Sequence, residues 1–496
     1  MNNYYEAICR GEDIRANLIE LKKICKEPQA AARLLAEGME RPVIEAFLEN
    51  DDAKIRKNAA LLLGELGLQE SARVLYEAYE KEETRFVRSA YLTALKALDV
   101  TEFLDVLQAR YEKLLAYEPA PEEQKHVAEE RGLLQKLLSQ SGVLKKHTFT
   151  GWKRKSDVIF TTERALRESL KRQLEAKSKN GILSAIHPFG VRVRTNELPL
   201  LCRLHSYREV LFALNLRQTI HGEASALAEA LLSSNLLELL EANHREAAPF
   251  YFRVELRGIN EAAEKSDLAK KISRELEQKS GGKLQNSTTD YEVELRLTCT
   301  KDGSFYPCLK LYTIPDERFI WRKRTISTSM HPSLAAALIE LARPYLSEEA
   351  VVLDAFCGVG TLMIERSLRM KTYDNYAVDI FGEAIAGAKE NAAAAGVDCN
   401  FITKDFTEFT SKHRMTEIFA DMPQRGKKTK EELDALYAGC FERFEQLLAP
   451  NGHLFLYSGE NGFVKKYLRL HSSLTLVREY EIRSREGGAF YVIGKR

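Results

Sequence analysis

One stretch decides the fold of this chain: Val351-Val352-Leu353-Asp354-Ala355-Phe356-Cys357-Gly358-Val359-Gly360-Thr361. It combines an apolar run, one acid, and two glycines separated by one residue that lead into an amphipathic segment. This order predicts a buried parallel strand that turns sharply into a helix, where doubly wound α/β folds bind a nucleotide-like ligand. The glycines let the backbone approach that ligand closely. Asp354, at the carboxyl end of the strand, is placed to hold a positively charged or hydrogen-bond-donating part of it.

The glycine pattern argues against a dinucleotide enzyme. Such enzymes carry a third glycine, in Gly-x-Gly-x-x-Gly, that packs the helix against the strand. Here Gly360 is followed by Thr361-Leu362-Met363, so pyrophosphate binding is disfavoured. A purely structural turn is the competing interpretation.

Two more predicted strands end in acids. The strand Tyr376-Ala377-Val378-Asp379 ends 19 residues after Gly360, where Rossmann-type sites place a carboxylate on ribose hydroxyls. A third strand is expected over residues 401–406 and contains Asp405 near its end. Each acid alone could cap a helix, but three acids at successive strand ends are harder to explain as caps.

The run Asp-x-Phe-Cys-Gly-x-Gly-Thr resembles motif I of the S-adenosylmethionine-dependent methyltransferases that methylate exocyclic amino groups in RNA and DNA. The resemblance implies S-adenosylmethionine as cofactor. It also implies that Asp405 accepts a hydrogen bond from the adenine amino group and that Phe406 lies near the adenine ring. The cofactor-binding residues expected in this way are Asp354, Phe356, Cys357, Gly358, Gly360, Thr361, Asp379, Asp405 and Phe406.

A fourth predicted strand, residues 417–420, leads into Asp421-Met422-Pro423-Gln424. This segment is similar to the Asp-Leu/Met-Pro-Phe form of the catalytic loop in RNA amino-methyltransferases, which implies catalytic roles for all four residues. An exocyclic amine has its lone pair delocalised into the base. A carboxylate and a backbone carbonyl that accept its two N–H bonds favour a pyramidal nitrogen aimed at the methyl donor. Pro423 stiffens the loop.

One residue departs from this family pattern. Gln424 stands where the family has an aromatic side chain that stacks on the target base. Such stacking contributes about 1–3 kcal/mol, so the substitution weakens base capture, changes which base is held, or marks a site that has lost activity. No cysteine follows Pro423, which argues against methylation of a ring carbon through a thiolate nucleophile.

Length and composition indicate the number of domains and the class of protein. A chain of 496 residues is too long for one hydrophobic core, and contents of 45% hydrophobic and 29% charged residues are those of an ordinary globular protein. We find no run of about 18 apolar residues and no leader at the start, so we expect a cytoplasmic protein that does not contact membranes. The eight cysteines lack metal-binding spacing and are expected to be reduced thiols, with no metal bound.

The first part of the chain is helical by period and contains an internal repeat. Ile55-Arg56 and Val87-Arg88 are 32 residues apart, as are Leu63 and Leu95. This is similar to HEAT-like repeats, in which the apolar residue packs between helices and the arginine ties neighbouring repeats. A plain helical bundle is the alternative. We expect residues 1–145 to form this domain and to offer a surface to a protein partner.

The middle of the chain has the pattern of two α+β modules, each with strands around a helix. Their order before the methyltransferase motifs resembles the THUMP-domain RNA methyltransferases, as does the linker from Trp321 into residues 331–338, although the family's Gly-Tyr pair is missing. The THUMP region is matched by pattern only. The expected boundaries are a ferredoxin-like domain at 150–245, a THUMP-like RNA-binding domain at 246–315, and a methyltransferase domain at 328–496.

Both tryptophans lie inside basic clusters. Aromatic rings interleaved with Lys and Arg suit phosphate contacts combined with base stacking, although such clusters are often solvated faces. The RNA-binding candidates are Trp152, Lys153, Arg154, Trp321, Arg322, Lys323 and Arg324.

The sequence thus predicts a multidomain protein with N-terminal α-helical repeats, a central α+β region and a C-terminal Rossmann-like α/β methyltransferase domain. The expected activity is S-adenosylmethionine-dependent methylation of an exocyclic amine in RNA, with guanine N2 of ribosomal or transfer RNA as the target, flipped out of its stack. Two alternatives remain open. One is an RNA-binding or assembly scaffold with a degenerate cofactor site, and the other is methylation of adenine N6 in DNA.

Overall fold

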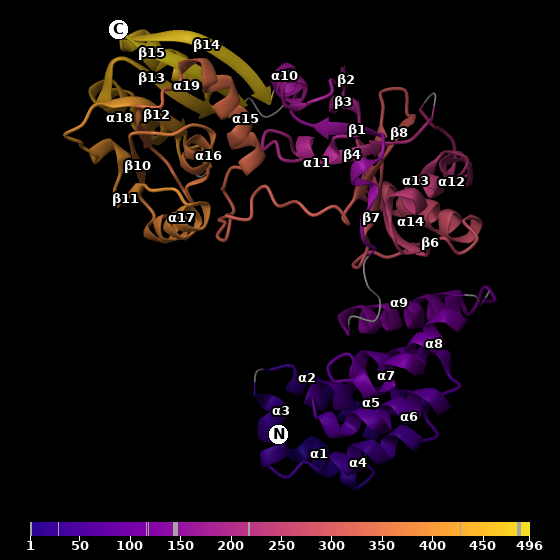
Figure 1. The fold of residues 1–496 in the computed structure, drawn as a ribbon. Coiled ribbons are helices and arrows are strands. Elements are labelled where there is room, and N and C mark those ends of the chain that lie inside the picture. Colours follow the sequence, from indigo (N-terminus) through magenta and orange to yellow (C-terminus); the bar gives the residue numbers. More distant parts are fainter. Residues whose placement is uncertain are drawn as a thin grey trace. The chain divides into compact units, whose positions relative to one another are not determined.

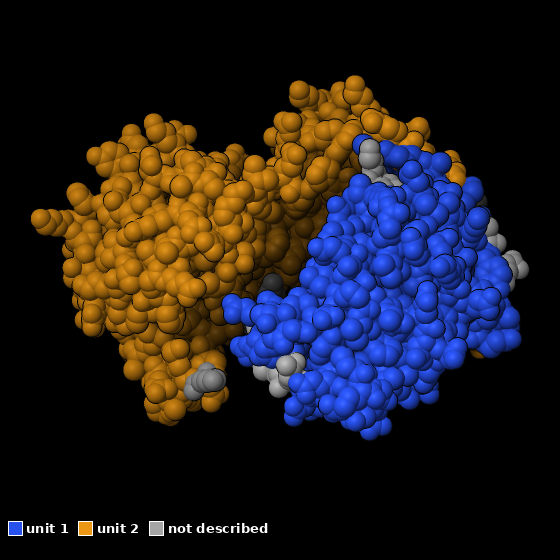
Figure 2. Space-filling view, turned by 90° about the horizontal axis from the view of Figure 1, so that it is seen from below, with its two compact units in different colours: residues 1–148, 246–253, 270–292 blue, residues 149–245, 254–269, 293–496 orange. Residues whose placement is uncertain are grey.

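The structure is a computed structural model, and it describes the chain except for residues 1, 28, 116, 118, 142–146, 217–218, 427 and 484–487. The chain divides into two compact units, which Figure 2 colours blue and orange. Unit 1 comprises residues 1–148, 246–253 and 270–292, and unit 2 comprises residues 149–245, 254–269 and 293–496. Within the described residues, no helix is long and apolar enough to cross a membrane.

Unit 1 begins with a series of helices (Figure 1). Four of them, α2, α5, α7 and α9, pack one on the next. Leucines such as Leu63 and Leu95 are fully buried among them. The predicted end of this region at residue 145 lies outside the described residues. The helices are α1 (Asn2–Cys9), α2 (Ile14–Cys25), α3 (Ala30–Ala36), α4 (Arg41–Ala46), α5 (Ala53–Leu66), α6 (Ala72–Lys81), α7 (Arg85–Leu95), α8 (Leu104–Leu115) and α9 (Gln124–Gln140).

The arginines of the repeat connect neighbouring helices, as predicted. Arg56 of α5 donates to the Glu82 carboxylate at 2.8 Å, just before α7 begins. Arg88 of α7 donates to the backbone carbonyl of Glu82 at 2.6 Å. Because Glu82 is only 5% exposed, its charge depends on this pairing, and loss of Arg56 would leave it buried and uncompensated.

The central region forms one mixed sheet with the strand order β2-β3-β1-β4-β8-β7-β5-β6. Its strands are β1 (Ser156–Thr161), β2 (Leu183–His187), β3 (Gly190–Thr195), β4 (Val210–Ala213), β5 (Phe250–Arg257), β6 (Leu284–Asn286), β7 (Val293–Cys299) and β8 (Phe305–Leu311). Its helices are α10 (Arg167–Lys177), α11 (Leu198–Leu201), α12 (Ala224–Leu232), α13 (Leu236–Asn243) and α14 (Ala262–Lys279).

The two predicted modules are joined within this sheet. β4, from the first module, pairs antiparallel with β8, from the second, with Phe212 opposite Leu309. Strands and helices alternate in both modules, as the periodicity predicted. The ferredoxin-like and THUMP-like assignments and their boundaries remain predictions.

The C-terminal region is a doubly wound α/β fold with the strand order β11-β10-β9-β12-β13-β15-β14. Its strands are β9 (Val351–Asp354), β10 (Asp374–Asp379), β11 (Asn400–Thr403), β12 (Met415–Asp421), β13 (Leu448–Ser458), β14 (Leu474–Arg483) and β15 (Gly488–Lys495). Its helices are α15 (Pro332–Ala342), α16 (Thr361–Arg369), α17 (Gly382–Ala395), α18 (Lys430–Leu447) and α19 (Asn461–Leu470).

Alternating residues of this sheet pack against helices on both faces. Val352 and Phe419 pack with α15 and α16, whereas Leu353 and Ile418 pack with α18. The strands β9 to β13 are parallel, and β15 runs antiparallel to its neighbours. From β9 the chain moves to β10 and β11 on one side and then to β12 on the other. The order therefore reverses between β9 and β12, and ligands of such sheets bind at the carboxyl ends of the strands there.

Candidate active site

A cavity of about 730 Å³ opens at the carboxyl ends of β9, β10 and β12. It brings together all the predicted cofactor-binding and catalytic residues except Gly360. The predicted residues that line it are Asp354, Phe356, Cys357, Gly358, Thr361, Asp379, Asp405, Phe406, Asp421, Met422, Pro423 and Gln424.

The two glycines of the turn have different roles. Both have left-handed backbones, with φ of 52° at Gly358 and 82° at Gly360. A Cβ at Gly358 would have only Ile326 Cδ1 near it, at 4.0 Å, so this glycine leaves room for a ligand. A Cβ at Gly360 would lie 3.3 Å from Ala388 Cβ. Gly360 therefore lets α16 approach α17, and its contact with the cofactor stays a prediction.

Asp354 is a buried acid whose carboxylate has no side-chain partner. It is fully buried, and neither carboxylate oxygen has a hydrogen-bond partner. Burial raises its pKa to about 8, and the charges of Asp421 and Asp379 raise it as well, whereas the backbone N–H groups of Met363 and Phe356 lower it in part. The hydroxyl of Thr361, also buried in the cavity wall, has no partner either. Buried polar atoms are rarely left unpaired, so these atoms point to a ligand with hydrogen-bond donors or positive charge.

Asp379 holds the glycine turn in place. Its Oδ2 accepts from the backbone N–H of Gly358 at 2.8 Å, and its Oδ1 accepts from that of Phe381 at 2.9 Å. Each carboxylate oxygen has a second acceptor site, so Asp379 can bind hydroxyls while it orders the turn.

Asp405 differs from its predicted setting. Strand β11 ends at Thr403, and Asp405 caps the short 3-10 helix η7 (Phe406–Glu408). Its Oδ1 accepts from the backbone N–H of Thr407 at 2.8 Å and from the Thr407 hydroxyl at 2.7 Å. The cap fixes one oxygen, and the residue still lines the cavity. Phe406, which follows, is 3% exposed, and its ring centroid lies 5.4 Å from that of Phe356.

Cys357 contributes shape rather than reactivity. Its backbone N–H donates to the carbonyl of Val378 at 3.0 Å, which joins the turn to β10. Burial raises the pKa of its thiol well above the ordinary value, and the nearby Asp354 and Asp379 raise it further. The group is therefore a neutral thiol at physiological pH.

Hydrogen bonds to neighbouring elements hold the loop after β12 in place. The backbone N–H of Met422 donates to the carbonyl of Tyr457 at 2.9 Å, and the Met422 side chain is 2% exposed. The Tyr437 hydroxyl lies 3.3 Å from the carbonyl of Pro423 and 2.8 Å from Ser458 Oγ. Asp421, the last residue of β12, and Gln424 of the loop both line the cavity.

Sequence reasoning missed some residues of the site. Tyr437, which contacts the loop after β12 without lining the cavity, comes 14 residues after Pro423 and belongs to no motif. Phe381 lines the cavity, is 68% exposed, and follows Asp379, the acid at the end of β10, by two residues. An aromatic residue at that place in the sequence could have indicated a ligand-binding residue. Ile326 and Lys404 also line the cavity. Within the described residues, no group of three or more His, Cys, Asp or Glu is arranged to hold a metal ion.

The predicted RNA-binding cluster at Trp321 is corrected by the structure. Trp321 is 4% exposed and packs with Ile364, Ala392 and Phe319, so its ring is not available to stack on a base. The sequence shows that basic residues surround it but not which way the ring points.

The basic neighbours of Trp321 also differ from one another. Arg322 is half-buried and donates to the carbonyl of Met330 at 3.2 Å. Arg324 pairs with Glu390 at 2.7 Å, and Lys323 is exposed. Lys323 and Arg324 therefore stay candidates for phosphate contacts, without an adjacent ring.

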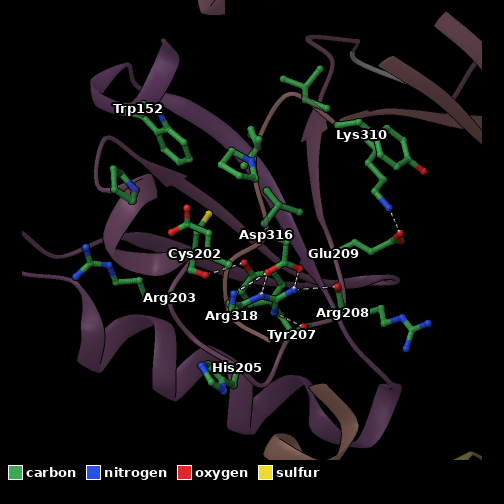
Figure 3. Close-up of a pocket in the computed structure, with 17 residues that line it drawn as sticks. Trp152, Cys202, Arg203, His205, Tyr207, Arg208, Glu209, Lys310, Asp316 and Arg318 are labelled. Atoms are coloured by element: carbon green, nitrogen blue, oxygen red, sulfur yellow. Dashed lines mark hydrogen bonds and ion pairs between the residues drawn. The ribbon is translucent and has the colours of Figure 1, made fainter. Parts of the chain in front are cut away.

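Trp152 lies in a second cavity, of about 1000 Å³, within unit 2 (Figure 3). Trp152 and Arg203 stand on one side of it, and Lys310 and Glu209 on the other. Lys310 pairs with Glu209 at 2.6 Å. The half-buried indole of Trp152 meets Phe149 edge-on, at 4.9 Å between ring centroids. The two remaining members of the predicted cluster, Lys153 and Arg154, are exposed but do not line the cavity.

The floor of this second cavity is a buried guanidinium. Arg318 pairs with Asp316 at 2.7 Å and donates to the carbonyl of Tyr207 at 2.7 Å (Figure 3). It also lies over the Tyr207 ring, 3.7 Å from the centroid. These contacts join the segment after β8 to the loop after α11.

Comparison with known proteins identifies the class of the C-terminal region. Residues 320–485 match the family model of the RMKL-like methyltransferase domain, and residues 21–113 match the model of HEAT repeats. The chain thus combines HEAT repeats with a methyltransferase domain. The prediction of S-adenosylmethionine as cofactor is confirmed for this class of domain.

Several solved structures share the fold. TrmN from Thermus thermophilus is 22% identical with a TM-score of 0.51, covering 68% of this chain and 99% of that one. SMU.472, complexed with SAH, is 14% identical with a TM-score of 0.51, covering 71% and 100%. A predicted N6-adenine-specific DNA methylase from Listeria monocytogenes is 14% identical with a TM-score of 0.51, covering 68% and 96%. At these identities the likeness is one of fold.

The residues of the first cavity fit S-adenosylmethionine. The space beside Gly358, which a side chain would fill, admits a ligand close to the backbone. The unpartnered oxygens of Asp354 and Thr361 suit a ligand that carries an ammonium group and hydroxyls. The buried wall at Phe406 suits an aromatic ring.

Proposed function

We propose that this chain is an S-adenosylmethionine-dependent RNA methyltransferase that acts on an exocyclic amino group, with guanine N2 of ribosomal or transfer RNA as its target. The observation that carries the proposal is the place of Asp421. It ends β12 at the point where the strand order reverses, in the same cavity as Asp354 and Gly358. An acceptor at that point suits an amine substrate.

The cofactor contacts follow from the cavity wall. Asp354 would hold the ammonium group, Asp379 the ribose hydroxyls, and Asp405 with Phe406 the adenine. When bound, S-adenosylmethionine supplies an electrophilic methyl group carried on a sulfonium.

Asp421 and its loop would act on the target amine. The Asp421 carboxylate accepts one N–H of the amine, which favours a nitrogen lone pair directed at the methyl group. Tyr437, through its contact with Pro423, keeps the loop from moving as the base enters. Most of the catalytic effect is then positioning and electrostatic stabilisation by groups that are already in place.

Gln424 would meet the flipped base at the cavity mouth. It is exposed and lines the cavity. Its amide offers a donor and an acceptor to the edge of a base, which an aromatic ring does not. Hydrogen bonds from this amide are one way to hold the base without a stacking ring, and the variants described in the Discussion test it.

RNA binding is proposed for the second cavity. Trp152 offers a ring for base stacking and Arg203 a cation for phosphate, which together are the two elements of single-strand recognition. The eight cysteines are free thiols, which fits the reducing cytoplasm that we propose as the place of action.

The test is methyl transfer to purified nucleic acid. The full-length protein, labelled S-adenosylmethionine and RNA from cells lacking the gene should yield N2-methylguanosine in nucleoside mass spectrometry. Asp421→Ala should abolish the product, and Glu431→Ala, an exposed acid on α18, should not. Methylation of adenine in DNA alone would replace RNA as the substrate. RNA binding without any transfer, by a protein that still binds cofactor, would support the scaffold alternative.

A further inference from the structure

Lysines gather where α2 and α5 pack together in unit 1. Lys22 of α2 donates to Asn58 Oδ1 of α5 at 3.3 Å across this seam. Burial lowers the pKa of Lys22, and the positive charges of Lys26 and Lys57 lower it further. Among the described residues, neither Lys26 nor Lys57 forms an ion pair with an acid. Glu65 offsets part of the repulsion at Lys22.

This local surplus of positive charge contrasts with its surroundings. Residues 1–146 contain more Asp and Glu than Lys and Arg. Elsewhere in unit 1, half-buried arginines have acid partners, such as Arg56 with Glu82 and Arg110 with Glu130. Like charges held close together destabilise the free protein. A bound anion would relieve that repulsion, so the unpaired lysines are a feature of a binding surface.

An aliphatic hollow adjoins the lysines. It has a volume of about 480 Å³. Ile14, Ile19 and Ile55 are among its lining residues, together with the charged Asp13 and Arg15. Ile19 and Lys22 are three residues apart and lie on one face of α2, and Lys26 is the residue that caps the C-terminal end of this helix. All three isoleucines are half-buried, and Ile14 of α2 and Ile55 of α5 pack against the core of unit 1; the two helices lie side by side (Figure 1).

We name the surface that carries these two features the α2–α5 strip. Its residues are Ile14, Ile19, Lys22, Lys26, Ile55 and Lys57.

We propose that the α2–α5 strip docks an acidic protein segment that carries aliphatic side chains. The lysines receive its carboxylates, and the hollow receives a Leu, Ile or Val side chain. RNA suits the strip less well, because recognition of single strands uses an open aromatic ring. The ring that contacts these lysines, Phe86, has Lys57 Nζ over it at 5.7 Å and lies 6.4 Å from the His126 ring between centroids.

The test uses the full-length protein and a fluorescein-labelled peptide of glutamates with leucine at every fourth position, in fluorescence anisotropy. The peptide should bind, and binding should weaken with salt. Replacing Lys22, Lys26 and Lys57 together with glutamine should weaken it about tenfold or more, and so should Ile19→Ser. The matched control replaces three exposed lysines on other helices or loops of unit 1, Lys81, Lys96 and Lys113, and should leave it unchanged. A polyglutamate peptide without leucine should bind more weakly.

Three results would overturn the proposal. The first is that no peptide binding is detected at about millimolar protein. The second is that the control variant loses as much affinity for the peptide as the variant of the three strip lysines. The third is that oligouridine displaces the peptide and that its binding depends on the same lysines, which would show that the strip binds RNA. A separate readout tests the repulsion itself: Lys26→Gln should raise the melting temperature of the free protein, and a fall would show that Lys26 serves the fold. None of these measurements involves methyl transfer, so this proposal and the proposed function fail independently.

Discussion

Asp354 and Asp421 end adjacent parallel strands and share one cavity. Asp354 is in register with Phe419 on β12, two residues before Asp421. The charge of Asp421 helps to raise the pKa of the buried Asp354 to about 8, after burial itself. Asp354 is thus mostly neutral at pH 7 in the free protein, and a positively charged ligand group beside it would favour its ionised form. The surroundings of the two acids differ, which fits the different roles proposed for them, Asp354 toward the cofactor and Asp421 toward the target amine.

The first prediction concerns stability and pH. In the unfolded chain an aspartate ionises near pH ~3.9, whereas Asp354 in the folded protein keeps its proton up to about pH 8. The folded state therefore binds more protons between these values, and its stability falls as the pH rises through that window. Asp354→Asn has no group that titrates at this position, so its free energy of unfolding does not fall in this way. The difference in the free energy of unfolding, variant minus wild type, should therefore increase by more than about 1 kcal/mol between pH 5 and pH 9.

Urea unfolding at both pH values measures this difference. Asp398→Asn, an exposed acid in the same domain, should show no such pH dependence. A constant offset between Asp354→Asn and wild type at all pH values would mean that Asp354 is ionised in the free protein.

The second prediction separates chemistry from cofactor binding. Asp421→Ala should reduce kcat by about 100-fold or more, the usual cost of removing one transition-state contact, while calorimetry shows little change in cofactor affinity. Gly358→Val should do the opposite, because its side chain fills the ligand space and cofactor binding is lost. An Asp421→Ala enzyme with normal kcat would exclude Asp421 from the mechanism.

The sequence predicted those parts of the site that depend on local chain geometry. A strand, an acid and a left-handed glycine turn leave a local pattern, and Asp354, Gly358 and Asp379 lie in the cavity where that pattern predicts. Spacing also indicated the repeat of Arg56 and Arg88, because equivalent side chains recur along stacked helices.

The rest depends on tertiary packing, which local pattern does not record. Trp321 lies among basic residues in sequence, yet its ring packs into the methyltransferase domain. Tyr437 reaches the catalytic loop from α18, and no short motif links the two. The pairing of β4 with β8 joins segments about a hundred residues apart, so the two predicted modules looked separate in the sequence.

The third prediction addresses the missing aromatic side chain. Gln424→Phe restores a ring at the cavity mouth, which would contribute about 1–3 kcal/mol of base stacking. If base capture limits the reaction, KM for RNA should fall by about fivefold or more with cofactor affinity unchanged. Gln424→Leu is the matched control, because it removes the amide without adding a ring. A loss of activity in both variants would show instead that the amide of Gln424 makes specific hydrogen bonds to the base.

The last prediction distinguishes the two tryptophans. Trp321 is buried, so Trp321→Ala should destabilise the methyltransferase domain by about 3–5 kcal/mol, as large-to-small changes in cores do. Trp152 lines the second cavity, so Trp152→Ala should weaken binding of oligouridine by about 1–3 kcal/mol, the worth of one stacked base. Trp152→Phe keeps a ring and should recover most of that affinity.

Thermal unfolding by circular dichroism and fluorescence anisotropy, run on the same samples, measure the two effects. If the Trp321→Ala protein is as stable as wild type but binds RNA more weakly, the Trp321 ring contacts RNA and is not a core residue. Unchanged affinity in Trp152→Ala would remove the second cavity from RNA recognition and leave Lys323 and Arg324 as the remaining basic candidates near the catalytic domain.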